Sequence, residues 1–376
     1  MAEHHPPRIA GLLPRERVLR SLRFQPPDVV PVEYHPSPAG IWEHGPALRQ
    51  LWERYPQDFG SPEDFPDRRP DPRFVDGTGR YEELRRDEWG VLWRHLLFGM
   101  HGHPVERPLD DWESLVQFHP PAVPVAEGED FLREQARALA HRRRYYLKSG
   151  WISLFEVMHA VRRFEDVLMD LARDTSEIHR LADRILEYQC GVIRYLLSRG
   201  VDAIQFGDDF GTCSGLMFSP KVWRRFFKPR YALLFREVRQ AGKAVFFHTC
   251  GNALPILEDI AELGIDAIWP QLPVYPPGEL ARFCRHHRIA MEIHPERGRL
   301  MIHGQPSEIV AEVYRLAEEF AVAEGGGWFY VEIDAGFPFP NVAALIETIG
   351  GMRQGVAIGS SPAAASPSFP GDLYGT

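Results

Sequence analysis

Two residues near the middle of the chain have the types and spacing of a metal site. His248 and Cys250 close the apolar stretch KAVFFHTC, residues 243–250, which has the composition of a β-strand. Residues two apart in a strand point to the same face, so we expect the imidazole and the thiol to project together. Zinc prefers imidazole nitrogen and thiolate sulfur as ligands. The pair therefore predicts two ligands of a zinc site; the alternative is a core histidine beside a small buried cysteine.

A third protein ligand would have to come from another strand. No cysteine follows Cys284, so the last apolar stretch, residues 328–334, can offer only carboxylates. Glu332 and Asp334 share one face of that stretch because they are two residues apart. Asp334, nearest the end of the strand, is our first choice for the third zinc ligand, and Glu332 is the second.

Three further polar residues close predicted strands and have the chemistry of acids and bases. Asp208 and Asp209 end the stretch 202–209, and His294 ends the stretch 289–294. We predict that these three side chains are catalytic, as proton donors or acceptors. The alternatives are that one aspartate caps the following loop while the other contacts substrate, and that His294 orders a loop through a hydrogen bond.

Two more strands carry side chains suited to binding a substrate. Glu33 and His35 end the first predicted strand, while Trp269 and Gln271 lie at the end of the strand that follows the His-x-Cys strand. We predict that these four residues contact a small, partly apolar organic ligand. Packing within the loops is the alternative role for the tryptophan.

The elements that position these residues alternate between strand and helix. The strands are short apolar runs without clean alternation, as expected where both faces of a parallel sheet are buried. Seven strands are predicted, at 28–35, 145–150, 202–209, 244–250, 266–271, 289–294 and 328–334. Strands that alternate with helices predict a parallel sheet with right-handed crossovers.

This order of elements predicts an α/β fold, a single (β/α)₈ barrel. The eighth strand is expected in the irregular region before residue 143. A doubly wound open sheet is the competing fold, but no Gly-rich phosphate loop follows the first strand to favour it. In a barrel the carboxyl ends of the strands carry the chemistry, which is where the polar residues described above lie.

The domain organisation follows from changes in composition. Residues 13–355 are predicted to form the barrel, interrupted by an irregular insertion at 55–130 that is rich in Pro, Asp, Arg and Trp and holds a strand-like piece at 87–97. Residues 1–12 are predicted to be a flexible leader. Residues 356–376 are rich in Ser, Ala, Pro and Gly and are predicted to be a disordered tail.

Composition excludes several classes of function. The 376 residues carry a formal net charge of −9, which argues against nucleic acid or an anionic membrane as a partner. Four cysteines in a chain of this length do not indicate a disulfide framework. No segment has the length of a signal peptide core or a membrane span. We therefore expect a cytoplasmic protein.

Several stretches together resemble the uroporphyrinogen decarboxylase-like superfamily. The resemblance runs from RERVLRSLRFQPPDVVPVE to FPNVAALIETI, at 15–33 and 339–349. It is densest in GDDFGTCSGLMFSPKVWRRFFKPRY, FHTCGN and LGIDAIWPQ, at 207–231, 247–252 and 263–271. The resemblance implies a (β/α)₈ barrel and is consistent with a homodimer.

The superfamily contains two chemistries. True uroporphyrinogen decarboxylases carry an Arg-rich signature just after the first strand, where this sequence reads PVEYHPSPAGIWEHG, without arginine. The other branch transfers methyl groups to or from a corrinoid protein and binds zinc through a His-x-Cys pair and a Cys on the last strand. His248 and Cys250 match that pair. The resemblance is therefore closer to the methyltransferase branch and implies zinc, with a corrinoid protein as partner.

The last strand departs from the pattern of that branch. It offers Glu332 and Asp334 in place of a cysteine, which puts thiol methylation in doubt and favours substrates with oxygen ligands. The resulting hypothesis is a zinc-dependent methyltransferase or demethylase acting on a small organic substrate. The alternative is a metal-independent decarboxylase or lyase of the same fold acting on a carboxylated substrate.

Overall fold

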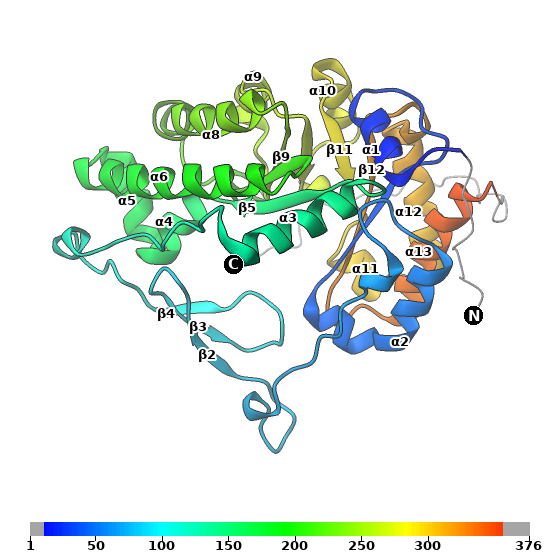
Figure 1. Cartoon of the computed structure of the whole chain (residues 1–376), viewed down its shortest axis with the longest axis horizontal. Coiled ribbons are helices and arrows are strands. Elements are labelled where there is room, and N and C mark those ends of the chain that lie inside the picture. The colour runs from blue at the N-terminus through cyan, green and yellow to red at the C-terminus, as the bar shows by residue number, and fades with distance from the viewer. Residues whose placement is uncertain (1–10, 356–376) are drawn as a thin grey trace.

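Seven parallel strands form the central sheet of the computed structural model, which describes residues 11–355 (Figure 1). Their order across the sheet is β1-β12-β11-β10-β9-β6-β5. The strands are β1 (Val32–Pro36), β5 (Lys148–Ile152), β6 (Ala203–Gly207), β9 (Ala244–Thr249), β10 (Ala267–Pro270), β11 (Ala290–Ile293) and β12 (Gly327–Ile333). Because the first strand pairs with the last, the sheet curls toward a barrel.

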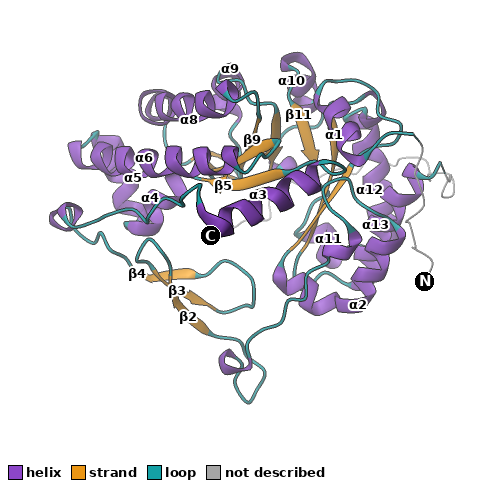
Figure 2. Ribbon diagram, viewed as in Figure 1, coloured by secondary structure: helices purple, strands orange, loops and turns teal. Residues whose placement is uncertain are grey.

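Helices surround this sheet, as Figure 2 shows. They are α1 (Pro14–Leu22), α2 (Pro38–Arg54), α3 (Gly128–Arg142), α4 (Phe155–Val161), α5 (Phe164–Arg173), α6 (Ser176–Ser198), α7 (Pro220–Val222), α8 (Lys228–Gln240), α9 (Leu257–Glu262), α10 (Glu279–His287), α11 (Arg299–His303), α12 (Pro306–Glu319) and α13 (Phe339–Arg353). A π-helical turn, Trp223–Phe227, joins α7 to α8. The predicted α/β barrel is confirmed.

The barrel has an irregular segment where an eighth strand would stand, between β1 and β5. There the backbone N–H of Asp58 donates to Val32 O (2.9 Å), and Tyr146 N–H donates to Asp58 O (3.2 Å). The Phe59 ring packs against Tyr146 and Trp328, with centroids 5.7 Å apart in both cases. Among residues 11–355 the sheet thus has seven strands, and this segment fills the place of the eighth.

Alternation along the strands divides side chains between the barrel interior and the helix-facing core. Phe246, Ala267, Ala290 and Trp328 form part of one buried interior cluster near the amino ends of the strands. Counting on in steps of two from Phe246 reaches His248 and Cys250, so these side chains point inward near the carboxyl ends. The register pairs Trp269 with His248 and Gly207 with His248, which places β6 and β10 on either side of the His-x-Cys strand.

The segment between α2 and α3 contains a small antiparallel sheet rather than a barrel strand. It consists of β2 (Glu83–Arg86), β3 (Leu92–His95) and β4 (His103–Glu106), in that order. Figure 1 shows it at the lower edge of the view, outside the ring of helices. A two-stranded hairpin, β7 (Gly211–Thr212) and β8 (Gly215–Leu216), follows β6.

Two predictions concern the ends of the chain. The leader predicted at 1–12 lies outside the described residues except for Gly11 and Leu12, and the tail predicted at 356–376 lies wholly outside them. Within 11–355, none of the helices combines the length and the apolar character needed to cross a bilayer.

Candidate active site at the barrel mouth

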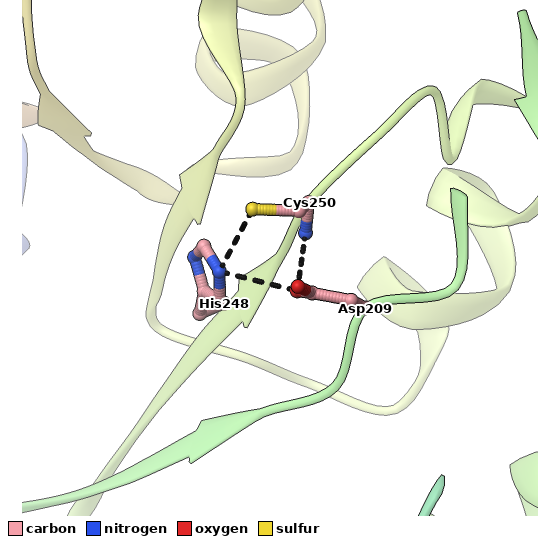
Figure 3. A group of neighbouring side chains, drawn as sticks. All are labelled: Asp209, His248 and Cys250. Carbon is pink, nitrogen blue, oxygen red and sulfur yellow. Dashed lines mark hydrogen bonds and ion pairs between the residues drawn. The ribbon is translucent and has the colours of Figure 1, made fainter. Parts of the chain in front are cut away.

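Three potential metal ligands converge at the carboxyl ends of β6 and β9 (Figure 3). His248 and Cys250 come from β9 and the residue after it, and Asp209 comes from the loop after β6. Cys250 Sγ lies 3.3 Å from His248 Nε2, and Asp209 Oδ1 lies 3.3 Å from the same nitrogen. The ligand atoms of all three residues lie within 4.8 Å of one another. They supply nitrogen, sulfur and oxygen donors at one point.

A backbone carbonyl fixes the orientation of the His248 ring. His248 Nδ1 lies 2.7 Å from Trp269 O. A carbonyl oxygen can only accept, so Nδ1 carries the hydrogen and Nε2 presents its lone pair to Cys250 and Asp209 in the neutral ring. Metal-binding histidines characteristically donate their other N–H to a carbonyl or carboxylate in this way.

Close backbone packing brings the two loops of the cluster together. Gly251 has φ +73°, and a Cβ there would lie 2.1 Å from the carbonyl carbon of Gly211. Only glycine combines this left-handed conformation with so close an approach. Gly211 N–H donates to Cys250 O (3.2 Å), and Cys250 N–H donates to Asp209 Oδ1 (2.9 Å). The two glycines therefore allow Asp209 to reach the His-x-Cys strand.

Electrostatics at the cluster favour a bound cation. Burial raises the pKa of the Cys250 thiol to about 12, and the negative charge of Asp209 adds to this rise. Burial also opposes ionisation of Asp209, but the His248 ring, when it is protonated on Nε2 as well, and the Cys250 N–H lower the pKa of that carboxyl. The cluster thus combines a carboxylate with a thiol that its surroundings keep protonated. A cation would stabilise both charged forms.

The last strand does not reach the His-x-Cys pair, which corrects the predicted third ligand. Glu332 forms an ion pair with Arg297, and Asp334 lies 4.0 Å from the same guanidinium. Among the described residues, neither carboxylate belongs to the metal-ligand cluster. Strands β10 and β11 lie between β12 and β9 in the sheet. Asp209 is the nearer carboxylate because β6 is the immediate neighbour of β9.

Asp208 is structural rather than part of the mouth, contrary to its predicted catalytic role. Its side chain is fully buried on the helix-facing side of β6 and accepts a hydrogen bond from Tyr231 Oη. It also accepts the backbone N–H groups of Leu154 (2.9 Å), Phe155 (2.7 Å) and Glu156 (2.8 Å). The carboxylate therefore caps the amino end of α4, which is the loop-capping role that we left open for one of the two aspartates.

His294 lies at the mouth but is buried and anchored to the backbone. Its Nε2 lies 2.8 Å from Pro270 O and its Nδ1 lies 3.1 Å from Pro295 O. Burial lowers the pKa of His294 to about 4, so the ring is neutral at physiological pH. This arrangement supports the alternative role, ordering the loop after β11, and it places the ring against the mouth cavity.

The residues predicted to bind substrate occupy different depths of the barrel. Gln271 Oε1 accepts the N–H of Gly251 (2.9 Å), and the Trp269 ring lies 3.9 Å from the His248 ring. His35 is exposed at the mouth and stacks on Tyr330 at 5.3 Å. Part of the His35 surface is open to solvent, but the protein atoms crowded around the ring desolvate it, and together with the charges of Lys148 and Arg297 this lowers the pKa of His35 to about 4. Trp269, Gln271 and His35 are thus brought to the mouth.

Glu33 lies deeper, away from the mouth. Its carboxylate is paired with Lys148 Nζ at 2.9 Å, and Lys148 also binds Glu292 at 2.6 Å. All three side chains are largely enclosed in the barrel interior. The Tyr330 ring lies over this group, with its centre 4.9 Å from Lys148 Nζ. The predicted contact of Glu33 with substrate is therefore not supported by its position.

A cavity of about 500 Å³ opens beside the cluster. Its walls include Gln271, His294, Arg297, Asp334 and Phe337. Gln271 connects this cavity to the cluster through its hydrogen bond with Gly251, which follows Cys250. Ligand sites of small molecules usually have volumes of about 300–1,000 Å³ with a few convergent polar groups. The cavity has this character.

Comparison with protein families identifies the fold independently. Residues 105–349, about two thirds of the chain, match the model of the family described as uroporphyrinogen decarboxylase (URO-D). The chain belongs to the URO-D family. The match spans β5 to β12 and includes all three residues of the metal-ligand cluster.

The fold of this URO-D family member is similar to that of a solved methyltransferase. A methyltransferase from Methanosarcina mazei is similar over 90% of this chain and 98% of its own, with 17% identity and a TM-score of 0.61. A B12-independent methionine synthase from Shewanella sp. W3-18-1 shares 13% identity over 82% of this chain and 85% of its own, with a TM-score of 0.36. The comparison with curated proteins gives no match. At this identity the methyltransferase shows the fold shared by the two chains.

Sequence reasoning missed Glu156 and Arg297 of this URO-D family member. Glu156 Oε2 accepts Trp151 Nε1–H (3.2 Å) and Ser153 Oγ–H (3.1 Å). Burial, followed by the charges of Asp208 and Asp209, raises the pKa of Glu156 to about 8. Neither residue ends an apolar stretch, so no strand pattern marks it; both follow strand ends by four positions.

Proposed function

We propose that the protein is a zinc-dependent methyltransferase- or demethylase-like enzyme in which Asp209, His248 and Cys250 hold the metal. The carrying observation is the convergence of their three donor atoms within 4.8 Å, with His248 Nε2 directed into the cluster. Nitrogen, thiolate and carboxylate donors all suit zinc. Three protein ligands leave a fourth position open, as catalytic zinc sites require.

The proposed ligand set defines what the neighbouring residues do. When bound, zinc would lower the pKa of a coordinated nucleophile or polarise an oxygen of the substrate. Glu156 retains a proton near neutral pH and stands close enough to Asp209 to feel its charge, so it is suited to donating a proton to a leaving group. Trp151 and Trp269 pack against the His248 ring, with centroids 5.4 and 3.9 Å away. Both rings cover the imidazole of the cluster.

The proposed substrate is a small organic molecule bound in the cavity beside the cluster, with a corrinoid protein as the methyl-carrying partner. Support comes from the His-x-Cys pair, from the cavity of about 500 Å³, and from the similarity in fold to a protein named as a methyltransferase. The carboxylate in the ligand set makes the metal harder than one held by two thiolates, which favours substrates that bind through oxygen.

Metal analysis of variants tests this proposal. Purified wild-type protein should contain about one zinc per chain, measured by elemental analysis after growth with added zinc. Asp209→Ala should weaken zinc binding at least tenfold, about 1.4 kcal/mol, in competition with a chelating dye. Asp334→Ala is the matched control and should bind zinc as the wild type does. Absence of zinc from the wild type, or loss of zinc only in Asp334→Ala, would contradict the proposed ligand set.

A second candidate function is a decarboxylase or lyase that works without metal. It is favoured by the description of the matching family and by two carboxyls at the mouth whose pKa values are raised by burial. Burial raises the pKa of Glu332 to about 8, as it does for Glu156. Turnover of a carboxylated substrate that persists after complete chelation would support this candidate against the first.

A further inference from the structure

A second cavity, of about 490 Å³, lies between the small antiparallel sheet and the start of α2. Basic side chains converge on it from separate parts of the chain. Arg68 and Arg69 come from the loop before β2, Arg85 from β2 and His95 from the end of β3. We refer to it as the outer cavity and to the cavity beside the metal-ligand cluster as the inner cavity.

The charge of the outer cavity is not neutralised by its own residues. Arg69 pairs with Asp67 at 3.0 Å, and Arg85 lies 3.9 Å from Glu83. Within residues 11–355, Arg68 has no carboxylate at ion-pair distance, although it lines the cavity. Three guanidinium groups therefore face two carboxylates, which leaves a net positive charge for an anion to meet.

A buried histidine on the same wall has an unpaired polar atom. The His95 residue is 9% exposed, and its Nδ1 lies 3.1 Å from Met100 O. Because that carbonyl can only accept, Nδ1 carries a hydrogen. Nε2 is buried without a hydrogen-bond partner in the described part of the protein. Buried polar atoms are nearly always paired, and this nitrogen holds a lone pair in the neutral ring, so its partner would be a hydrogen-bond donor rather than the charged end of an anion.

Aromatic side chains give the outer cavity an apolar component. Tyr81 and Phe98 line it, with ring centroids 5.8 Å apart in an edge-to-face arrangement. An inorganic anion would leave these rings without a contact. Rings combined with guanidinium groups instead suit an organic anion that carries a flat apolar part.

The outer and inner cavities adjoin at one residue. Met100 lines both, and its loop is pressed against α2: a Cβ on Gly99 would lie 2.4 Å from Pro38 Cβ. Gln271, on the inner cavity, contacts the backbone next to Cys250. The loop 96–102 thus stands between a basic outer site and the metal-ligand cluster.

We propose that the outer cavity binds the anionic end of an elongated, ring-containing organic substrate, such as a carboxylate. The other end of the substrate, which carries the group to be transferred or cleaved, occupies the inner cavity beside Asp209, His248 and Cys250. This inference rests on the proposed function for the identity of the reacting end. The recognition of the anion rests on Arg68 and Arg85.

Calorimetric titration of the full-length protein with two probes of equal shape tests the inference. The probes are 4-methoxybenzoate and its neutral amide, 4-methoxybenzamide. The wild type should bind the anion at least tenfold more tightly than the amide, and raising the salt from about 0.05 to 0.3 M should weaken only anion binding. The double variant Arg68→Gln/Arg85→Gln should lose this preference and bind the amide as the wild type does.

Arg86→Gln is the matched control. Arg86 is on the same strand as Arg85, but its guanidinium contacts Gly90 O and Glu106, away from the outer cavity. Its anion preference should equal that of the wild type. Equal binding of both probes by the wild type, binding of neither at about 5 mM, or an equal loss in Arg86→Gln would overturn the inference.

Zinc content measured in the same samples separates this inference from the proposed function. Anion preference in protein without zinc would remove the proposed metal chemistry but support the outer site. Zinc in protein that shows no anion preference would support the proposed metal site and overturn the outer anion site. Neither probe requires turnover, so the titration does not depend on knowing the reaction.

Discussion

Lys148 and its two carboxylates illustrate how single residues set the chemistry of the barrel interior. The ammonium lies between Glu33 and Glu292, and one oxygen of Glu292 is buried without a hydrogen-bond partner in the described residues. One ammonium group thus compensates the charge of two carboxyl groups in a region of low dielectric constant. Burial raises the pKa of Glu33 to about 7, Lys148 opposes this rise and Glu292 adds to it. Glu33 therefore takes up a proton on folding near neutral pH.

This proton uptake predicts how Glu33→Gln changes stability with pH. The pKa of Glu33 is about 7 in the folded protein, against an ordinary value of 4.5. Between these values the folded state binds more protons, so the contribution of Glu33 to stability falls as pH rises. Gln imitates the neutral acid and does not titrate. Relative to the wild type, Glu33→Gln should therefore gain up to about 3 kcal/mol between pH 4.5 and 8.

Urea unfolding of both proteins at a series of pH values measures this difference. Glu53→Gln is the control, because Glu53 is half exposed and pairs with Arg49 at the surface. Its stability relative to the wild type should hardly change with pH. A difference between Glu33→Gln and the wild type that is constant from pH 4.5 to 8 would show that Glu33 titrates normally.

The sequence predicted part of the site at the scale of residues. His248 and Cys250 were predictable because two-residue spacing alone places both on one strand face. Asp209 was predicted as catalytic, but not as a ligand of the pair. Its position depends on which strand neighbours β9, and on the close contact of Gly211 with Gly251. Neither fact is contained in the spacing of a single strand.

At the scale of elements, Asp208 links a strand of the barrel to the helix that carries Glu156. Its carboxylate accepts three backbone N–H groups at the start of α4, and the N–H of Glu156 is one of them. These groups have no partner within the helix, because the first turn of any helix leaves its N–H groups free. The side chain of Asp208 therefore sets both the stability of α4 and the position of Glu156.

Removal of this cap should destabilise the protein. Asp208→Ala leaves three buried backbone donors and the Tyr231 hydroxyl without an acceptor. Each unsatisfied buried donor costs about 1–3 kcal/mol, and partial relaxation lowers the sum, so we expect a loss of about 3–5 kcal/mol. Urea unfolding in the presence of a chelator measures this loss without a contribution from metal. A loss below about 1 kcal/mol would contradict the capping role.

Glu165→Ala is the control for a carboxylate at the start of a helix. Glu165 lies in the first turn of α5 and is exposed. Its removal should cost no more than about 0.5 kcal/mol, the usual range for a surface substitution. Comparison of the two variants separates a buried cap from a general effect of negative charge at a helix amino end.

The outward direction of Asp208 follows from the same two-residue spacing that identified His248 and Cys250. Along β6, Ala203 lies in the interior cluster, so Gln205 and Gly207 continue that face and Asp208 falls on the other. The order of strands and helices was also predictable, because parallel strands and crossover helices have distinct apolar patterns. The strand-like piece predicted at 87–97 contains β3, but its pairing with β2 and β4 was not predicted, since these two strands are four residues long and largely exposed.

At the scale of the whole molecule, Asp58 holds the barrel together where the eighth strand is missing. The buried carboxylate pairs with Arg17 of α1 at 3.1 Å and with Arg353 of α13 at 2.5 Å. It also accepts the N–H of Val32 in β1 (2.9 Å). Its backbone joins Val32 to Tyr146, just before β5. The first helix, the last helix and both open sides of the sheet therefore meet at one residue.

The sequence could not reveal these contacts of Asp58 because the residues that make them are far apart in the chain. Asp58 is 41 positions from Arg17 and 295 from Arg353, and no periodic pattern surrounds it. An isolated aspartate in a Pro-rich segment has the appearance of a loop residue. Complete burial of its side chain became visible only with the barrel assembled, because the residues that bury it come from both ends of the chain.

Asp58→Ala should therefore weaken the closure of the barrel between β1 and β5, as well as lower the stability of the protein. Removing one member of a buried ion pair costs about 3–5 kcal/mol, because the other charge stays buried; Arg17 keeps its second ion pair, with Asp28. Here two buried guanidinium groups lose a partner. Urea unfolding should show that loss, while Asp64→Ala, at an exposed position in the same segment, should change stability by less than about 0.5 kcal/mol.

Hydrogen exchange distinguishes a local contact between β1 and β5 from a general contribution of Asp58 to stability. Amides of β1 and β5 should exchange faster in Asp58→Ala than those of β9 and β10, which lie away from this closure. Uniform acceleration across all four strands would show that Asp58 stabilises the fold without closing it.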